Sequence, residues 1–315
     1  MPEILGIAAI TAGFSPASGA TLKISAASRN SMQLPSDGDL TALAGKLGPK
    51  GFAALIDHTN LSATARRKDI ELLCQEAREM GAASVCINGD DVLLARKVLE
   101  NSAVRICTVI GFPLGADTPH VKVKQAEDAF MNGAHEVDMV IDISSALERD
   151  FEDVRNEIRM VLAVRDRVNM LAQDPRLVKV IIETCYLQEK ELIQEACRIA
   201  KQEHADFVKS STGFGQPQAG IPKGATFEFI SWMRDAVGPY HARNPIGVKA
   251  SGGIGDARTA LQMLLAAGIL DSKGQLNGDT ARVVRIGASK GPDILKDFAE
   301  RYVKGGAGSA TLSDY

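Results

Sequence analysis

The sequence predicts an α/β protein, a (β/α)8 barrel of the TIM type with an N-terminal extension. Short β-branched apolar runs alternate with helical patterns, which is typical of βα units that build a parallel sheet. Eight such runs lie about 20 to 42 residues apart, far enough for a strand, a loop and a helix each time. No G-x-G-x-x-G turn follows the first run, so a closed barrel is favoured over an open doubly wound sheet.

Helical patterns fill the segments between the strand-like runs. In residues 67–80 apolar side chains recur at three- and four-residue spacing, and Gly81 follows as a stop for the helix. Residues 189–203 repeat this plan. The expected strands are residues 53–57, 84–88, 104–111, 136–141, 177–183, 206–210, 246–251 and 283–287.

The two ends of the chain differ from the barrel in composition. Residues 1–45 are rich in Gly, Ala, Ser and Thr and have little apolar periodicity. We expect an extension of unknown role there, ending in a short helix over residues 37–47. The barrel itself is expected over residues 46–304. Residues 305–315 are rich in Gly and Ser and are expected to form a flexible tail.

Composition is that of a soluble globular protein, with 45% apolar and 24% charged residues. The net charge of only -3 indicates neither a nucleic-acid nor a membrane partner. The oligomeric state stays open, with a homodimer as one alternative. Five cysteines without a C-x-x-C pair suit a reducing compartment, and no apolar stretch reaches the roughly 18 residues of a transmembrane helix. We therefore expect a cytoplasmic protein. The Ser- and Ala-rich segment 11–36 leaves organelle import as an alternative.

Charged residues within the apolar runs are candidate site residues, because the active site of a (β/α)8 barrel lies at the C-terminal ends of its strands. Burial disfavours the charge of a lysine in the lumen, and a second ammonium group nearby lowers the lysine pKa further. A neutral lysine amine attacks a carbonyl and forms an iminium, which lets the adjacent carbon–carbon bond break or form. Five charged residues occupy such positions: Asp57, Asp138, Lys179, Lys209 and Lys249.

Lys209 and Lys249 fit this chemistry best. They lie 40 residues apart at equivalent points of consecutive strands, so their amines should be close together. Asp138 is suited to relay the protons that the reaction requires. The alternative for each lysine is a structural ion pair in the lumen. That alternative fits Lys179, which stands deeper in its strand, with Glu183, Glu136 or Asp57 as its expected partner.

Two glycine-rich turns follow the seventh and eighth runs, at the place where barrels of this kind usually hold phosphate. They are SGGIG at residues 251–255 and GASKG at residues 287–291. Their backbone N–H groups can bind an anion, although each turn alone could be an ordinary strand end. Together they predict a phosphate-binding site.

The histidines predict no metal site, because they form no H-x-H, H-E-x-x-H or Cys/His cluster. His58 is the one histidine that the sequence places near the site, since it follows Asp57 at a strand end and could line the mouth of the site. The alternative is a structural histidine held by a hydrogen bond. Motifs of P-loop NTPases and α/β-hydrolases do not occur either. The histidines are His58, His120, His135, His204 and His241.

The motifs in this order resemble the deoxyribose-phosphate aldolase family. They are IDHTNL, VCIN, VIGFPLG, GAHEVDMVID, VKVIIET, DFVKSSTGF, VKASGGI and RIGAS, and the resemblance covers about residues 50 to 305. It implies a lyase of deoxyribose phosphate catabolism that needs no metal or organic cofactor. The implied reaction is reversible cleavage of 2-deoxy-D-ribose 5-phosphate to D-glyceraldehyde 3-phosphate and acetaldehyde.

The resemblance also assigns roles to residues. The Schiff-base lysine falls on Lys209, the lysine that lowers its pKa on Lys249, and the proton-relay aspartate on Asp138. The chain ends in Tyr315, which resembles a terminal tyrosine that enters the site in some members; an incidental tyrosine is the alternative. Residues that match the phosphate-binding and pocket-lining groups of the family are Gly252, Gly253, Gly287 and Ser289 for phosphate, and Asp57 and Thr212 for the pocket.

The chain departs from some members of the family at the expected phosphate site. Phe214 stands where they carry a lysine, and Gly255 where they carry an arginine. Lys290 is a candidate to compensate for the lost positive charge. The preference for phosphorylated over free sugars therefore stays open.

Two other functions remain as alternatives. One is another Schiff-base or phosphate-binding barrel enzyme, such as a transaldolase-like or hexulose-phosphate enzyme, with the same lysine chemistry on a different sugar. The other is a catalytically silent relative used as a binding scaffold. The joint presence of Asp138, Lys209 and Lys249 argues against a scaffold.

Overall fold

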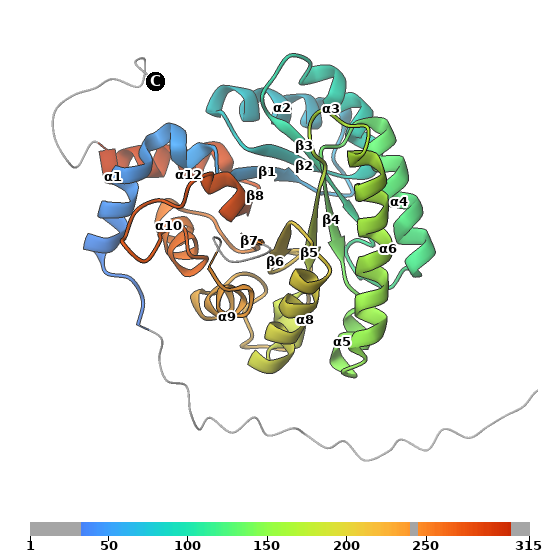
Figure 1. The fold of residues 1–315 in the computed structure, drawn as a ribbon. Coiled ribbons are helices and arrows are strands. Elements are labelled where there is room, and N and C mark those ends of the chain that lie inside the picture. The colour runs from blue at the N-terminus through green and yellow to red at the C-terminus, as the bar shows by residue number, and fades with distance from the viewer. Residues whose placement is uncertain (1–32, 240–244, 304–315) are drawn as a thin grey trace, which may run out of the picture. The chain divides into compact units, whose positions relative to one another are not determined.

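The predicted barrel is confirmed by a computed structural model, which describes residues 33–239 and 245–303. Eight parallel strands close into a barrel in chain order, with the helices outside it (Figure 1). The strands are β1 (Ile56–Asn60), β2 (Ser84–Ile87), β3 (Arg105–Ile110), β4 (Glu136–Val140), β5 (Leu177–Ile181), β6 (Phe207–Lys209), β7 (Gly247–Ser251) and β8 (Val284–Ala288).

The helices between the strands bury their apolar faces against the outside of the barrel, as the three- and four-residue spacing of α2 predicts. The described helices, including one before β1 and one after β8, are α1 (Asp37–Ala53), α2 (Arg67–Met80), α3 (Val92–Val98), α4 (Pro119–Asn132), α5 (Ile143–Leu147), α6 (Phe151–Asn169), α7 (Thr184–Leu187), α8 (Lys190–Gln202), α9 (Phe227–Val237), α10 (Ala257–Ala266), α11 (Thr280–Val283) and α12 (Gly291–Phe298). Two short turns, η1 (Gly89–Asp91) and η2 (Ala299–Val303), complete the described elements.

Helix α1 is longer than the sequence pattern predicts. It begins at the expected residue, where Ser36 accepts a hydrogen bond from the Asp39 amide in a capping box, but it continues through Ala53 with a kink at Gly48. Phe52 near its end is buried and stacks on Phe298 of α12, with ring centroids 4.3 Å apart. The first strand therefore begins at residue 56 and not at residue 53.

The expected boundary between extension and barrel, at residue 45, falls within α1. Leu40 and Leu43 are buried in the same apolar core as the strands, so the unit that carries the barrel includes this helix. Figure 1 shows α1 beside α12, and the two helices are in contact. The expectations for residues 1–32 and for the tail from residue 304 lie outside the described residues.

Strand register places charged residues of neighbouring strands side by side in the lumen. Asp138 of β4 pairs with Lys179 of β5, and Lys209 of β6 pairs with Lys249 of β7. Lys249 in turn pairs with Arg285 of β8. Because alternate residues of a barrel strand face inward, these side chains share one interior.

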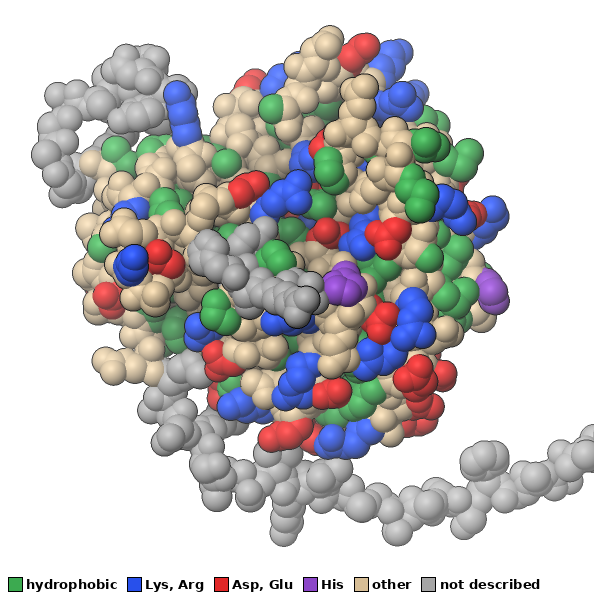
Figure 2. All heavy atoms as spheres, in the orientation of Figure 1, with side chains coloured by type: hydrophobic (Ala, Val, Ile, Leu, Met, Phe, Trp, Pro, Cys, Tyr) green, Lys and Arg blue, Asp and Glu red, His purple; other side chains and the backbone are tan. Residues whose placement is uncertain are grey.

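The surface of the molecule also carries charged side chains of both signs. Figure 2 shows acidic and basic side chains interspersed over one face of the molecule, without a large area of one sign. None of the described helices combines the length and the hydropathy that a membrane span requires.

Candidate active site

Asp138 is the centre of the charged network in the lumen. The Nζ atoms of Lys209 and Lys249 each lie 2.8 Å from its Oδ2, and Lys179 Nζ lies 2.8 Å from its Oδ1. All four side chains are buried. The structure therefore brings together the three residues that the sequence singled out for Schiff-base chemistry.

The electrostatic surroundings keep Asp138 ionised. Burial alone would raise the pKa of its carboxyl, but the ammonium groups of Lys179, Lys209 and Lys249 outweigh burial and hold that pKa well below its usual range. The ionised carboxylate accepts hydrogen bonds at both of its oxygens.

Lys249 is held in its charged form by two carboxylates. Its Nζ lies 2.5 Å from Asp57 Oδ2 in addition to its contact with Asp138. Burial lowers the pKa of Lys249, but the charges of Asp138 and Asp57 raise it by more, so it lies above the usual lysine value. A fixed positive charge thus stands beside the Lys209 amine, since both amines contact the same carboxylate oxygen.

Lys179 forms the structural ion pair that its depth in the strand predicts. Its Nζ lies 2.6 Å from Glu136 Oε2 and 3.7 Å from Asp57 Oδ2, as well as next to Asp138. Of the three expected partners, Glu183 is not in contact with it. Glu183 instead stands between β5 and α7 in a left-handed conformation, with φ of 52°, and binds the loop after β6.

Arg285 of β8 is a lumen residue that the sequence analysis missed. Its guanidinium donates to Asp57 Oδ1 at 2.7 Å and to Glu136 Oε1 at 3.3 Å. The available signal was a single arginine within the apolar run VVRIGA. Arg285 and Lys249 hold Asp57 below the floor of the cavity, so Asp57 does not line the pocket as the family resemblance led us to expect.

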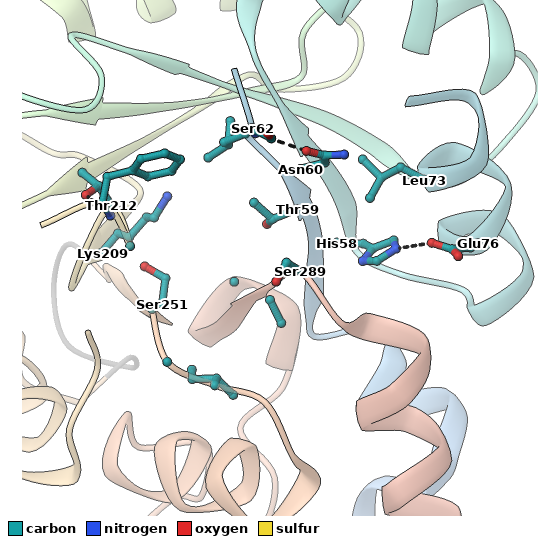
Figure 3. A pocket seen from close by; sticks show the side chains of 18 of the residues that line it. His58, Thr59, Asn60, Ser62, Leu73, Glu76, Lys209, Thr212, Ser251 and Ser289 are labelled. Carbon is teal, nitrogen blue, oxygen red and sulfur yellow. Dashed lines mark hydrogen bonds and ion pairs between the residues drawn. The ribbon is translucent and has the colours of Figure 1, made fainter. Parts of the chain in front are cut away.

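A cavity of about 750 Å³ opens above this network, at the C-terminal ends of the strands. Lys209 reaches it from below with only 3% of its surface exposed. In Figure 3 the Lys209 side chain extends toward the middle of the cavity, with Ser251 and Thr212 on its own side and Thr59 and Ser289 across from it. Lys209 is the only lysine or arginine among the lining residues that the structure describes.

The glycine-rich turns form the part of the cavity wall expected to bind phosphate. Gly252 and Gly253 have φ of 86° and 77°, a conformation that favours glycine. A Cβ at Gly287 would lie 2.9 Å from the Cβ of Ser251, so this position accepts only a glycine without rearrangement. These three glycines and Ser289 all line the cavity. Lys290, expected to compensate for missing positive charge, is exposed and does not line it.

The opposite wall carries polar groups from β1 and α2. His58 lines the cavity and its Nε2 lies 2.8 Å from Glu76 Oε2, so the hydrogen-bonded alternative and the mouth-lining one both hold for this residue. In Figure 3 this pair lies away from Lys209.

Thr212, on the same side as Lys209, lines the cavity as expected. Glu183 Oε2 accepts hydrogen bonds from the Thr212 backbone amide, at 3.1 Å, and from the Thr212 hydroxyl.

One group of side chains has metal-ligating atoms close together, among the residues with described positions. Cys86, Cys107 and Asp138 place such atoms within 4.8 Å of one another. The Asp138 oxygens already accept from three ammonium groups, which would repel a cation. The donor set is therefore a poor metal site. Tyr315 and His241 lie outside the described residues.

Sequence comparison places the chain among aldolases. A family model described as DeoC/LacD family aldolase matches residues 52–297. A deoxyribose-phosphate aldolase from Thermoanaerobacter sp. (strain X514) is 44% identical over 248 residues, which cover 78% of this chain and 96% of that protein. Another from Clostridium perfringens is 48% identical over 203 residues, or 64% of this chain and 82% of its own length.

Solved structures agree with this relationship. QR15, an aldolase, has a TM-score of 0.64 and 33% identity, with 80% of this chain and 97% of that chain covered. A tetrameric deoxyribose phosphate aldolase from Aeropyrum pernix has a TM-score of 0.65 and 27% identity, with 84% and 98% covered. In both comparisons the matched region spans almost the whole of the other chain.

Proposed function

The chain belongs to the DeoC/LacD aldolase family, and on that premise we propose that it cleaves 2-deoxy-D-ribose 5-phosphate through a Schiff base on Lys209. The products are D-glyceraldehyde 3-phosphate and acetaldehyde, and the reaction is reversible. The observation that carries the proposal is the shared acceptor: Lys209 and Lys249 both donate to Oδ2 of Asp138 beneath the cavity floor.

The first step requires an uncharged amine on Lys209. Lys249 places a second ammonium group beside this amine, since both contact Oδ2 of Asp138. The amine attacks the aldehyde carbon C1 of the open-chain sugar, and a proton moves from nitrogen to the developing alkoxide to give a carbinolamine. Asp138 contacts the nitrogen at 2.8 Å and can carry this proton.

Dehydration and carbon–carbon cleavage are the next steps of the reaction. Protonation of the carbinolamine hydroxyl releases water and leaves an iminium on Lys209. Removal of the proton of the 3-hydroxyl breaks the bond between C2 and C3, and the electron pair moves into the iminium to form an enamine. The C3 carbon leaves as the aldehyde of glyceraldehyde 3-phosphate. Protonation of the enamine at C2 and addition of water then release acetaldehyde and restore Lys209.

The phosphate end of the substrate fits the turns after β7 and β8. Gly252, Gly253 and Gly287 line the cavity without side chains, and Ser289 adds a hydroxyl. The fixed donors of such turns can bind a dianion without a lysine or an arginine. We place this activity in the breakdown of deoxyribose phosphate, in accord with the names of the relatives.

An aldolase assay tests the proposal. Purified protein should release acetaldehyde from 2-deoxy-D-ribose 5-phosphate, and Lys209→Ala should lose at least about a thousandfold in kcat. Lys190→Ala, which removes an exposed lysine from the start of α8, should keep full activity. Activity on a hexulose phosphate but not on deoxyribose 5-phosphate would favour the alternative sugar, and no activity on either would favour the scaffold.

A further inference from the structure

A second cavity, of about 840 Å³, opens at the other end of the barrel. Its wall includes Val104, His135 and Arg176, which stand just before β3, β4 and β5. Because the strands are parallel, this is the N-terminal face, opposite the cavity above Lys209. Helices α3 and α4, which are in contact and lie side by side in Figure 1, contribute further lining residues together with the segment that follows α3.

The lining combines an apolar surface with basic groups. Arg96, Lys97, Arg176 and His135 face a single lining acid, Glu100. Neither Arg96 nor Lys97 forms an ion pair with any residue of the described chain. The apolar part of the wall is made of Leu93, Leu99, Val104, Ile106, Phe130 and Met131.

Packing fixes two of the basic groups in the wall. The Cδ of Arg96 would lie 2.6 Å from a Cβ at Gly133, so the arginine stem lies directly over this glycine at the end of α4. His135 Nδ1 accepts the Ile106 amide at 3.0 Å, which leaves Nε2 to carry the ring proton. Arg96 is otherwise exposed, so its guanidinium is open to a ligand.

The Arg176 guanidinium is only partly satisfied by the chain. Its NH1 donates to the Asp174 carbonyl at 3.5 Å and lies 3.7 Å from the Asp174 carboxylate, while its Nε is buried and has no hydrogen-bond partner among the described residues. Burial lowers the pKa of Arg176, and the charges of Arg105 and Arg96 lower it further against the opposing effect of Asp174. Burial also lowers the pKa of His135, with Arg105 and Arg176 adding to that effect. Four of the five ionisable side chains that line the cavity are basic.

We propose that this N-terminal cavity is a second binding site, one that takes a small organic oxyanion with an apolar body. The oxyanion would accept from the guanidinium groups of Arg176 and Arg96, and the apolar body would lie against Phe130 and Met131. Phosphate monoesters and carboxylates share this chemistry. The site does not depend on the aldolase reaction, because none of its residues lines the cavity above Lys209.

The methionine methyl groups allow a local test on the full-length protein. Met131 lines the N-terminal cavity, whereas Met80 does not line it and packs beside Gly291 at the start of α12. Protein labelled with ¹³C at the methionine methyls is titrated with phenyl phosphate, benzoate, inorganic phosphate and the neutral benzyl alcohol, and Met131→Leu assigns the signal. We expect saturable shifts of the Met131 methyl with the two aromatic anions and none with the alcohol.

Variants separate specific binding from general attraction to a basic surface. Arg96→Ala and Arg176→Ala should each weaken binding at Met131 about tenfold or more, since a charged hydrogen bond contributes about 1.5 to 3 kcal/mol. Arg198→Ala removes an exposed arginine of α8 and should change nothing. Arg176→Lys keeps the charge and serves if the alanine variant does not fold.

The stronger of the two aromatic anions identifies the oxyanion as phosphate ester or carboxylate. Absence of any saturable Met131 shift up to tens of millimolar would overturn the proposal. Equal affinity in the wild type and both arginine-to-alanine variants would overturn it as well.

Discussion

Lys209 and Lys249 donate to one and the same oxygen atom, Oδ2 of Asp138, each at 2.8 Å. Their Nζ atoms can therefore be no farther apart than twice that distance. Strand register produces this arrangement, because the two lysines are direct partners on the adjacent strands β6 and β7. One amine thus reaches the cavity while the other stays below it as a fixed charge.

Replacing Lys249 should slow catalysis strongly without unfolding the barrel. Lys249→Met keeps a similar volume but removes the charge, so we expect kcat to fall by about a hundredfold or more. The variant still has Lys179 and Arg285 to balance Asp57 and Asp138. Steady-state kinetics and a thermal melt check both parts, with Lys190→Met as the control. A kcat within twofold of the wild type would contradict the role given to this charge.

The carboxylates of the lumen should make stability depend on acid pH. Burial raises the pKa values of Asp57, Glu136 and Asp138, but the surrounding lysines and Arg285 lower them by more, so all three lie below their usual values. Below about pH 4 the unfolded chain then binds more protons than the folded protein. Their contribution to stability is present above that pH and is lost as the pH falls further, by up to about 1.4 kcal/mol per group and pH unit.

Asp57→Asn isolates one of these contributions. Urea unfolding at pH 7, 5, 4 and 3 should show the variant less stable than the wild type at pH 7, with the gap narrowing between pH 4 and pH 3. Asp235→Asn, at an exposed position of α9, should leave a constant difference. A gap between wild type and Asp57→Asn that widens on acidification would be the wrong sign.

Much of the fold could be predicted because strand and helix periods are local properties of the chain. The limits of β2 to β8 lie within two residues of the expected ones. The spacing of Lys209 and Lys249 also gave their adjacency, since consecutive parallel strands of a barrel are neighbours. The first strand was misplaced because apolar Phe52 and Ala53 belong to the end of α1, which packs on α12.

The height of the charged residues within the lumen could be predicted only in part. Position along its own strand correctly placed Lys179 deep in the lumen, but the height of one strand against another depends on strand tilt and stagger, which no local pattern reveals. For this reason Asp57 was expected at the pocket but lies below it. Arg285 was missed although it is a charged residue within an apolar run. Glu183 was one of three alternative partners expected for Lys179, and it is the one not in contact, because its backbone is left-handed and its side chain binds the loop after β6.

Glu183 should act by positioning that loop. Its carboxylate accepts from the amide and the hydroxyl of Thr212, three residues after Lys209. Glu183→Ala leaves buried donors without a partner, so we expect a loss of about 1 to 3 kcal/mol in unfolding free energy and a higher KM. Glu183→Gln keeps a carbonyl acceptor, so its loss of unfolding free energy and its rise in KM should both be smaller. Equal losses in the two variants would show that hydrogen bonding to Thr212 is not the cause.

The low positive charge around the cavity should limit the preference for phosphorylated sugars. Phe214 lines the cavity mouth with 45% of its surface exposed. Phe214→Lys places an ammonium group there and should lower KM for deoxyribose 5-phosphate about tenfold, with KM for free deoxyribose unchanged. Phe214→Met removes the ring without adding charge and is the matched control. A parallel change for both sugars would mean that the phosphate is not bound on this side.

Borohydride trapping tests the central claim most directly. The protein is reduced in the presence of deoxyribose 5-phosphate or acetaldehyde, digested, and mapped by mass spectrometry, with Lys209→Ala and Lys190→Ala treated in the same way. We predict a stable adduct on Lys209 that persists in Lys190→Ala and is absent from Lys209→Ala. No adduct, or an adduct on another lysine that survives in Lys209→Ala, would contradict a Schiff base at this residue.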